Sequence, residues 1–511
     1  MKNEVVLLLV LCSAPLLAAE RINQEGRILG PEPVVAAPVL FNTAAADAIV
    51  GAMQVMPLDN PWNEDVSGRP RLANSDAMIA QIRADLSSSR RTLRAFFEMN
   101  YVLVPDTQPN VPIAFVDYPD ESDPSPYPLP ANLPVETWPR ETGTLTLQQW
   151  QQDVNGDGGD RHAIVVMPGA GFAWETWQTV LAGTAWQASN GAKFNLRSNA
   201  LRPAGWTSGD AAGLPMFPAL VRYDECQRGM VEHATRVVVA RSRREYLYPA
   251  NHYASSTPAT QVNVPAMGQR VRLKAAFTIP AEWTIYERAV CLGLKKYGAL
   301  VADNGGFFSI SVTPDDRYPD GAFDHLASID LNNFEIVQAT GPTEGPRSPG
   351  APIASAGADL DVLFPAAAPV VIGGSATGAG VTVEWTKYSG PGIVTFGNPA
   401  QAATTASFSM PGTYTLMINA RDGVHAAARD AVVVHVVLPV VVMRIGDNAT
   451  VIFRSAIGQT YRVERAPDSS GSSWTVVADG LAGTGAGIAV EDPGAFWDHP
   501  GAVHRVQFTP Q

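Results

Sequence analysis

Short β-strand patterns, separated by clusters of glycine, proline and serine, fill most of the chain beyond residue 160 and constrain its fold more than any other feature. In the middle of the chain they cover residues 163–167, 235–239, 271–277 and 307–312. Their β-branched or alternating residues are typical of strands. We therefore expect a mainly β chain, with a β-rich α+β N-terminal domain followed by two β-sandwich modules.

Helix patterns are few. A cap residue at Asn74, followed by apolar residues at spacings of three and four, predicts a helix with one buried face. The clearest pattern opens at Pro280, keeps its apolar residues on one face and stops at Gly298. A third, short helix is expected over residues 92–99.

The length and two boundary signals divide the chain. Its 511 residues exceed one ordinary domain of roughly 150 residues. An apolar run over residues 5–17, closed by Ala18-Ala19-Glu20, has the pattern of a secretory signal peptide. The expected parts are a signal peptide (1–19), a leader segment (20–56), a β-rich candidate catalytic domain (57–339), a Gly/Pro/Ser-rich linker (340–352), an immunoglobulin-like module (353–438) and a C-terminal β-sandwich module (440–511).

Charge and hydropathy limit the partners. With 36 basic and 49 acidic residues the formal charge is -13, which repels phosphate backbones and makes nucleic acid an unexpected partner. Beyond the signal we find no run of the roughly 18 apolar residues that a membrane span needs. We expect a secreted or extracellular protein, with association at the cell surface as an alternative. No oligomer signal is visible, so a monomer is expected.

If Cys12 leaves with the signal peptide, Cys226 and Cys291 are the cysteines of the mature chain. In an exported protein they could form one disulfide bond. The alternative is two buried thiols that behave as small apolar side chains.

The module after the linker resembles a known family. The residues that carry the resemblance are Gly357-Ala358-Asp359, Trp385-Thr386, Pro411-Gly412-Thr413-Tyr414 and Ala420-Arg421-Asp422-Gly423. They are similar to the polycystic-kidney-disease (PKD) type of immunoglobulin-like sandwich. The resemblance implies a spacer or binding accessory in a secreted or surface protein, without chemistry of its own.

The N-terminal domain resembles a group of secreted bacterial proteins. The motifs that it shares with them are Asp59-Asn60-Pro61-Trp62-Asn63, Asp120 to Pro124, Asp160-Arg161-His162, Leu196 to Pro203 and Lys295 to Gly298. This resemblance implies export and no particular activity.

One loop has the spacing of a calcium site. Asp153, Asn155 and Asp157 supply oxygens at the first, third and fifth positions, a glycine stands at the sixth, and Asp160 could complete the cage. The twelfth position, where an EF-hand has glutamate, is Ile164. The alternative is a polar turn, which Asn-Gly and Asp-Gly pairs favour. Calcium is thus the first cofactor to consider.

The side chains suited to catalysis concentrate between residues 160 and 303. The candidate catalytic residues are Asp160, His162, Glu225, His233, His252 and Asp303. Glycoside hydrolysis needs a pair of carboxyl groups and aromatic platforms for sugar rings. If residues 223–225 form a strand, alternation puts Glu225 rather than Asp224 on the face of Tyr223, so Glu225 and Asp303 are the preferred pair.

Three functions follow from these residues. The leading hypothesis is a secreted, glycan-directed protein, a polysaccharide hydrolase that uses a carboxylate pair and an assisting histidine. The first alternative is a non-catalytic binding or adhesion protein that contacts a polysaccharide or cell-surface glycan. The second is a metal enzyme in which His162, His233 and His252 bind zinc or copper with Asp303, although no short His-x-His or HExxH spacing supports it.

Overall fold

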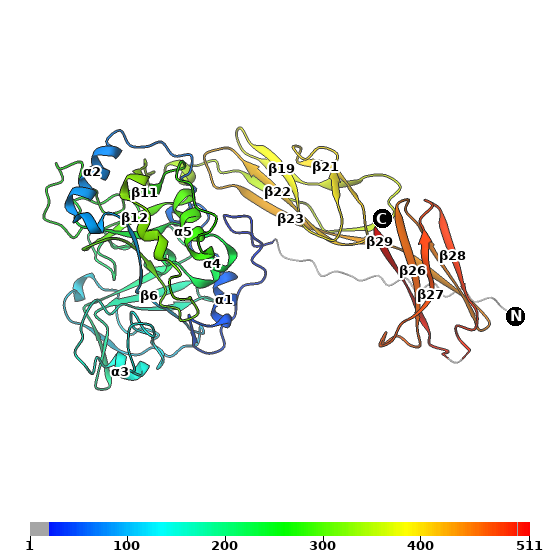
Figure 1. Cartoon of the computed structure of the whole chain (residues 1–511), viewed down its shortest axis with the longest axis horizontal. Coiled ribbons are helices and arrows are strands. Elements are labelled where there is room, and N and C mark those ends of the chain that lie inside the picture. Colours follow the sequence, from blue (N-terminus) through cyan, green and yellow to red (C-terminus); the bar gives the residue numbers. More distant parts are fainter. Residues whose placement is uncertain (1–19, 498, 511) are drawn as a thin grey trace. The chain divides into compact units, whose positions relative to one another are not determined.

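The computed structural model describes residues 20–497 and 499–510, and Figure 1 shows its helices and strands. The chain divides into two compact units. We call residues 21–351 the N-terminal unit, and residues 352–423 with 427–510 the C-terminal unit. The expected signal peptide, residues 1–19, lies outside the described residues.

Three sheets build the N-terminal unit. A six-stranded sheet has the order β14-β11-β12-β10-β13-β2, a five-stranded sheet has the order β1-β3-β5-β6-β9, and a three-stranded sheet has the order β4-β8-β7. The strands are β1 (Val39–Leu40), β2 (Leu93–Phe97), β3 (Val102–Leu103), β4 (Ile113–Phe115), β5 (Ala163–Met167), β6 (Phe172–Trp177), β7 (Val180–Ala182), β8 (Ala185–Ala188), β9 (Asn190–Asn195), β10 (Thr235–Val239), β11 (Arg270–Leu273), β12 (Ala299–Asn304), β13 (Phe308–Val312) and β14 (Phe334–Ile336).

Three of the five α-helices of this unit begin at a capping side chain, Thr43, Thr146 or Thr284. α5 begins at Ile285, where Thr284 and Glu287 form a reciprocal capping box, and α2 buries Met78 and Ile79 on one face. Both confirm helices that the sequence predicts. The α-helices are α1 (Ala44–Gly51), α2 (Ser75–Asp85), α3 (Leu147–Gln151), α4 (Tyr223–Arg228) and α5 (Ile285–Lys296).

Two expectations about secondary structure are wrong. Residues 92–99 contain strand β2, which pairs in parallel with β13, because tertiary pairing overrides a weak local helix preference. Residues 223–225 begin helix α4, so the alternation argument that separated Asp224 from Glu225 does not apply. Both side chains are buried.

The leader segment also differs from expectation. Within residues 20–56, α1 begins after the capping side chain of Thr43, and Phe41 and Val50 are buried in the core of the N-terminal unit. Apolar residues that the sequence analysis placed before the folded part therefore belong to it.

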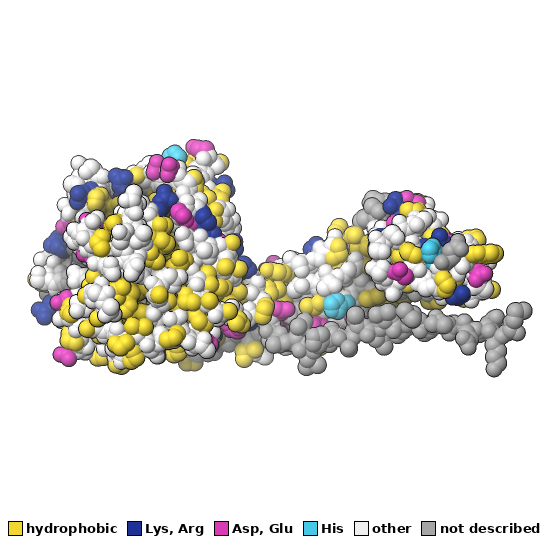
Figure 2. Space-filling view, turned by 90° about the horizontal axis from the view of Figure 1, so that it is seen from below, with side chains coloured by type: hydrophobic (Ala, Val, Ile, Leu, Met, Phe, Trp, Pro, Cys, Tyr) yellow, Lys and Arg dark blue, Asp and Glu magenta, His cyan; other side chains and the backbone are white. Residues whose placement is uncertain are grey.

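One hydrophobic core joins the two large sheets of the N-terminal unit. Ile164 and Val166 reach it from β5, and Val237 and Val239 reach it from β10. Side chains alternate along a strand, so Arg236 stands on the opposite face of β10. On the face of this unit that Figure 2 shows, apolar side chains are spread widely, and Lys and Arg are scattered.

The C-terminal unit consists of β-sheets. Its first half pairs β16-β23-β22-β19, β17-β21-β20 and β15-β18, and its second half pairs β24-β25-β28 and β27-β26-β29. The strands are β15 (Ile353–Ser355), β16 (Leu360–Leu363), β17 (Val370–Gly373), β18 (Ser375–Thr377), β19 (Thr382–Ser389), β20 (Val394–Phe396), β21 (Ala403–Phe408), β22 (Gly412–Arg421), β23 (Ala428–Val437), β24 (Val440–Ile445), β25 (Asn448–Arg454), β26 (Gln459–Ala466), β27 (Thr475–Ala482), β28 (Gly487–Asp492) and β29 (Val503–Pro510). The mainly β fold is confirmed.

Two further observations concern the cysteines and the membrane. Cys226 and Cys291 are both buried free thiols, which is the second of the two alternatives above. Among the described residues, no helix combines the length and the apolar composition that crossing a bilayer requires.

Candidate functional site

Arg236 lies at the centre of a group of charged side chains in the N-terminal unit. Its Nε and Nη2 each donate to a carboxylate oxygen of Asp210 over 3.1 Å, and its Nη1 donates to the hydroxyl of Ser311 over 2.8 Å. Arg236 and Asp210 are buried. An unpaired charge in the interior is costly, so this bidentate pair anchors the group.

Two further carboxylates approach the same guanidinium and reach solvent. Oε2 of Glu98 lies 3.9 Å from Nη1 of Arg236, and Oδ2 of Asp303 lies 3.5 Å from Nη2. The side chains of Glu98 and Asp303 are 27% and 30% exposed, against 3% for Arg236. We name Glu98, Asp210, Arg236, Asp303 and Ser311 the Arg236 cluster. It offers two carboxylates to a ligand above one buried cation.

Burial raises the pKa of Glu98 and of Asp303, although both side chains are partly exposed. The pKa of Glu98 is raised to about 7, mainly by burial, although Arg236 and the hydroxyl of Ser311 act in the opposite direction. The pKa of Asp303 is raised to about 6 by burial and by the neighbouring carboxylate of Asp210. Near neutral pH Glu98 is therefore the better proton donor of the two, and Asp303 is more often ionised.

A β-bulge places Asp303. β10 and β12 run in parallel, with Val237 opposite Val301 and Val238 opposite Asp303, so Ala302 is an extra residue in β12. A bulge re-aims the side chains around it and is common beside functional sites. Here it puts Asp303 opposite Val238, on the sheet face of Arg236.

His162 and Glu136 form a second ion pair close to the Arg236 cluster. Nδ1 of His162 lies 2.8 Å from Oε2 of Glu136, and Nε2 lies 2.9 Å from the carbonyl oxygen of Gly209. Burial disfavours the charged ring, but Glu136 outweighs it and raises the pKa of His162 to about 9. Both ring nitrogens of His162 face an acceptor oxygen, which fits a doubly protonated ring that donates from both nitrogens. The pKa of Glu136 is lowered, since His162 outweighs its burial.

The backbone beside this pair is strained. Thr137, next to Glu136, has φ of 66°, and Arg161, next to His162, has φ of 46°. Left-handed conformations cost roughly 1 to 3 kcal/mol for residues other than glycine, and they gather at functional sites. Arg161 is fixed by bonds from its guanidinium to the carbonyl oxygens of Trp150 and Thr179. The surrounding structure thus holds Glu136 and His162 in a costly but defined position.

His252 belongs to a stack of rings near the end of β12. Its ring is parallel to that of Tyr253, with centroids 6.0 Å apart, and Tyr253 stacks on Tyr246 in turn. Nδ1 of His252 bonds to the carbonyl oxygen of Ala211, which follows Asp210 in the chain. The side chain of Asn304, next to Asp303, donates to the backbone of this loop. The ring stack is therefore tied to the strand end that carries Asp303.

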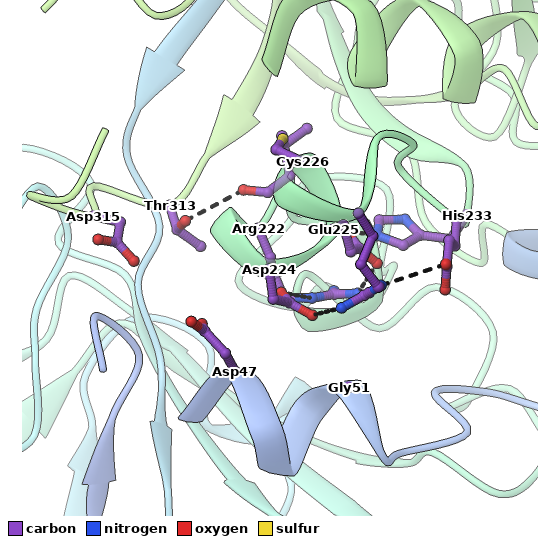
Figure 3. Close-up of polar contacts among 12 residues, drawn as sticks. Asp47, Gly51, Arg222, Asp224, Glu225, Cys226, His233, Thr313 and Asp315 are labelled. Carbon is purple, nitrogen blue, oxygen red and sulfur yellow. Dashed lines mark hydrogen bonds and ion pairs between the residues drawn. The ribbon is translucent and has the colours of Figure 1, made fainter. Parts of the chain in front are cut away.

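Glu225 and His233 lie in a different group, which we name the Arg222 cluster: Arg222, Asp224, Glu225, Arg228 and His233. Figure 3 labels Arg222, Asp224, Glu225 and His233. One oxygen of Glu225 accepts from Arg222 and the other lies 3.0 Å from Nε2 of His233. Asp224 accepts from Arg228 over 2.7 Å. Burial would raise the pKa of Glu225, but Arg222 and His233 outweigh it and lower the pKa to about 2.

The candidate catalytic residues thus fall into separate groups. Asp303 is in the Arg236 cluster, and His162 pairs with Glu136 beside it. Glu225 and His233 are bonded to each other. Asp160 accepts a bond from the indole of Trp177. In the part of the chain that the structure describes, no hydrogen bond or ion pair joins the Arg222 cluster to the Arg236 cluster.

The candidate calcium loop is organised by its own backbone. Asp153 accepts from the amide of Asp157 over 3.0 Å and lies 3.5 Å from Nη1 of Arg161. Asn155 donates to Asp157 over 3.4 Å. Over residues 20–497 and 499–510, no group of three His, Cys, Asp or Glu side chains is placed to hold a metal ion. Calcium at Asp153, Asn155, Asp157 and Asp160 stays a prediction.

The ring nitrogens of His162 and His233 already bond to other groups of the protein. Both ring nitrogens of His162 have partners, and His233 bonds to the carbonyl oxygen of Ala234 as well as to Glu225. A metal ligand needs a free nitrogen lone pair, so these two rings would have to give up existing bonds to bind zinc or copper.

Sequence reasoning missed Glu98, Glu136 and Arg236. Glu98 and Glu136 lie before the stretch in which catalytic residues were sought, in no motif. Arg236 carried a usable signal, because it interrupts the apolar strand β10. A charge in a buried strand must be paired, so this arginine predicts carboxylate partners.

Comparisons with known proteins give little. No family model matches the chain, and no curated protein matches it. Among solved structures, the PKD domain of the KIAA 1837 protein matches at 24% identity and a TM-score of 0.16, over 17% of this chain and 89% of that one.

Two longer structures also match in part. Cadherin domains 3-6 of protocadherin gamma B2 match at 12% identity and a TM-score of 0.15, over 31% of this chain and 47% of that one. The adhesin InvE of Yersinia pseudotuberculosis matches at 12% identity and a TM-score of 0.17, over 34% of this chain and 58% of that one. The chain thus spans less than two thirds of either.

Proposed function

We propose that the N-terminal unit is an extracellular glycan hydrolase in which Glu98 and Asp303 are the two catalytic carboxyl groups. The observation that carries the proposal is their geometry: both reach solvent and both lie within 4.0 Å of one buried guanidinium. The signal-like residues 5–17 support an extracellular location. Asp303 was expected in the pair, and Glu98 replaces Glu225 as its partner.

The two carboxyl groups can divide the chemistry of glycosidic cleavage. Glu98, with its pKa raised to about 7, protonates the oxygen of the leaving sugar. Asp303, with its pKa raised to about 6, is ionised and stabilises the positive charge that develops at the anomeric carbon as the glycosidic bond breaks. Water then adds to this carbon, and the ionised Glu98 takes up the proton that the water loses. Arg236 holds both groups in position and favours the ionised form of Asp303.

His162 and Glu136 act as positioning residues in this scheme. Glu136 raises the pKa of Glu98 and His162 lowers it, both through space. The ion pair therefore adds two small and opposite contributions to the pKa of Glu98, which burial dominates, without touching the substrate. The strained backbone at Thr137 and Arg161 holds the pair in place.

A glycan is the proposed substrate class because aromatic rings are attached to the elements that position the two carboxyl groups. Phe96 of β2 pairs with Ser311 of β13, so the two side chains share a face of the sheet, and Phe96 is half-buried. The stack of Tyr246, Tyr253 and His252 is tied to the strand end of Asp303. Aromatic platforms of this kind bind sugar rings.

The test is the rate of hydrolysis of a polysaccharide panel as a function of pH. We expect a bell-shaped profile with limbs near the two raised pKa values, about 6 for Asp303 and about 7 for Glu98. Glu98→Gln should remove the alkaline limb and most of the rate, while Glu282→Gln, at an exposed glutamate, should change neither. Binding of a glycan by the wild type without any product would contradict the proposal and leave the binding-protein alternative.

A further inference from the structure

A pocket of about 360 Å³ lies in the N-terminal unit, apart from the Arg236 cluster. Three motifs that the sequence analysis singled out meet in it: Asn60 and Trp62 come from the first, Asp123 from the second, and Ser198 to Pro203 from the fourth. The volume lies at the lower end of the range for small-ligand sites, roughly 300 to 1,000 Å³. The catalytic proposal gives these residues no role.

The pocket contains a buried acceptor that lacks a donor. The side-chain nitrogen of Asn251 donates to the carbonyl oxygens of Arg202 and Pro203, over 3.2 and 2.8 Å, which fixes the orientation of the amide. Its Oδ1 is buried and has no hydrogen-bond partner, although Asn251 is only 2% exposed. Leaving such an atom unsatisfied costs about 1 to 3 kcal/mol, so the two bonds from its nitrogen hold the amide in place.

Gly213 packs directly against that acceptor. It lines the pocket with Asn251, has φ of 71°, and a Cβ at this position would collide with Oδ1 of Asn251. Glycine therefore meets two demands at once, the left-handed backbone and the close contact with the amide oxygen of Asn251.

Lys193 supplies the charge of the pocket. Its ammonium lies 4.2 Å from the centroid of the Phe172 ring, and the side chain is exposed. Asp123, the one acidic residue in the described lining, is paired with Arg202 over 2.8 Å. The pocket therefore keeps one positive charge that an anionic ligand can pair with.

Other groups in the pocket are fixed before a ligand arrives. Asn199 accepts from Asn60 over 2.8 Å and donates to Asp59 over 2.9 Å. Phe194 and Phe172 present half-buried rings. A preformed lining of rings and a few directed polar atoms is typical of small-ligand sites.

We propose that this pocket binds an acidic sugar residue, a hexuronate. The carboxylate pairs with Lys193, and an apolar ring face packs on the aromatic lining. The choice of a sugar rests on the proposed function, and the hexuronate assignment adds a binding site outside the catalytic cluster.

Binding is measured on the full chain by calorimetric titration with glucuronate, galacturonate, glucose and galactose at low salt. We expect the two uronates to bind up to about fivefold more tightly than the neutral sugars, as expected for one partly exposed ion pair. Lys193→Met keeps the packing on Phe172 and should remove the preference. Ala200→Trp, at an exposed lining residue, should block all binding.

Two controls separate this site from folding and from catalysis. Lys274→Met removes a lysine outside this pocket, whose amine bonds to Asn332, and should leave binding unchanged. Glu98→Gln should remove most of the turnover and leave uronate binding intact. If Glu98→Gln loses turnover but the wild type does not bind uronates, this inference alone is overturned. If the wild type binds uronates but turnover is the same in Glu98→Gln as in the wild type, the proposed function alone is overturned.

Two results would overturn the assignment directly. One is equal affinity of the wild type for uronates and neutral sugars, and the other is an unchanged preference in Lys193→Met. Melting curves of each variant show whether lost binding reflects the pocket or an unfolded chain.

Discussion

The N-terminal unit contains two arginine-centred clusters that are alike in composition and differ in access to solvent. Each combines a buried arginine with two or more carboxylates, and each has a histidine within or beside it. In the Arg222 cluster, Glu225 is 2% exposed and accepts from Arg222 and His233. In the Arg236 cluster, the side chains of Glu98 and Asp303 are 27% and 30% exposed.

The difference shows in the protonation of Glu225 and Glu98; the pKa of Asp224, the other carboxylate of the Arg222 cluster, is raised by burial. The pKa of Glu225 is lowered to about 2, because its charged partners outweigh burial. The pKa of Glu98 is raised to about 7, because burial outweighs the single guanidinium at its side. A buried carboxylate whose two oxygens both have hydrogen-bond partners stabilises the fold. An accessible carboxylate with a raised pKa can exchange a proton with a substrate.

The largest effect is expected from Asp303→Asn, which should lower the rate of glycan hydrolysis by roughly 10²- to 10⁴-fold, the contribution typical of a catalytic acid or base. The amide keeps the size of the side chain and one oxygen near Arg236, so the melting temperature should change little. Product release and melting curves check both parts. A large loss of stability would assign Asp303 to the scaffold, like Glu225.

A smaller but clear effect on stability is expected from Glu225→Gln. Removing one partner of a buried ion pair costs about 3 to 5 kcal/mol. Arg222 would lose the carboxylate to which it donates and keep only the more distant Asp224, 3.8 Å away, as a counterion. Urea unfolding measures the loss, and the folded fraction should hydrolyse substrate at the normal rate. Unchanged unfolding with lost activity would reverse the roles of the two clusters.

The next effect is a dependence of the free energy of unfolding on pH, which arises from the titration of His162. Its pKa is raised from 6.5 to about 9 in the folded protein. The stabilising contribution is therefore complete below about pH 6.5 and is lost as the pH rises to about 9. The loss is on the order of 3 kcal/mol. Urea unfolding across this range should show the slope, and His162→Gln should flatten it; a slope that survives the substitution would contradict the assignment.

The smallest effect is expected from reduction of the protein. Cys226 and Cys291 are buried free thiols, and burial raises the pKa of Cys291 to about 12, so neither is reactive near neutral pH. A reducing agent should leave the melting temperature unchanged. A drop of several degrees would show that the two cysteines are bonded.

Much of the fold follows from local pattern. β5 and β10 have the bounds that the sequence predicts, and α2 and α5 begin within a few residues of their expected caps. These elements bury one regular face, so hydrophobic periodicity decides them. β2 was misread because its pairing with β13 brings together residues some two hundred positions apart, which no local signal reports.

The site was less predictable than the fold. The partners of Arg236 come from β12, β13 and two loops, and their meeting depends on the bulge at Ala302. The sequence suggested Asp303 by residue type, but it could not separate Glu225 from Glu98. What separates them is the number of partners each carboxylate has, and this depends on tertiary structure.

The most direct test of this comparison is product release from a polysaccharide panel by three forms of the protein. The account predicts that the double variant Glu98→Gln/Asp303→Asn releases no product above background, while Glu225→Gln, measured per folded molecule, matches the wild type. Equal release by the double variant and the wild type would contradict the assignment of the Arg236 cluster as the catalytic centre.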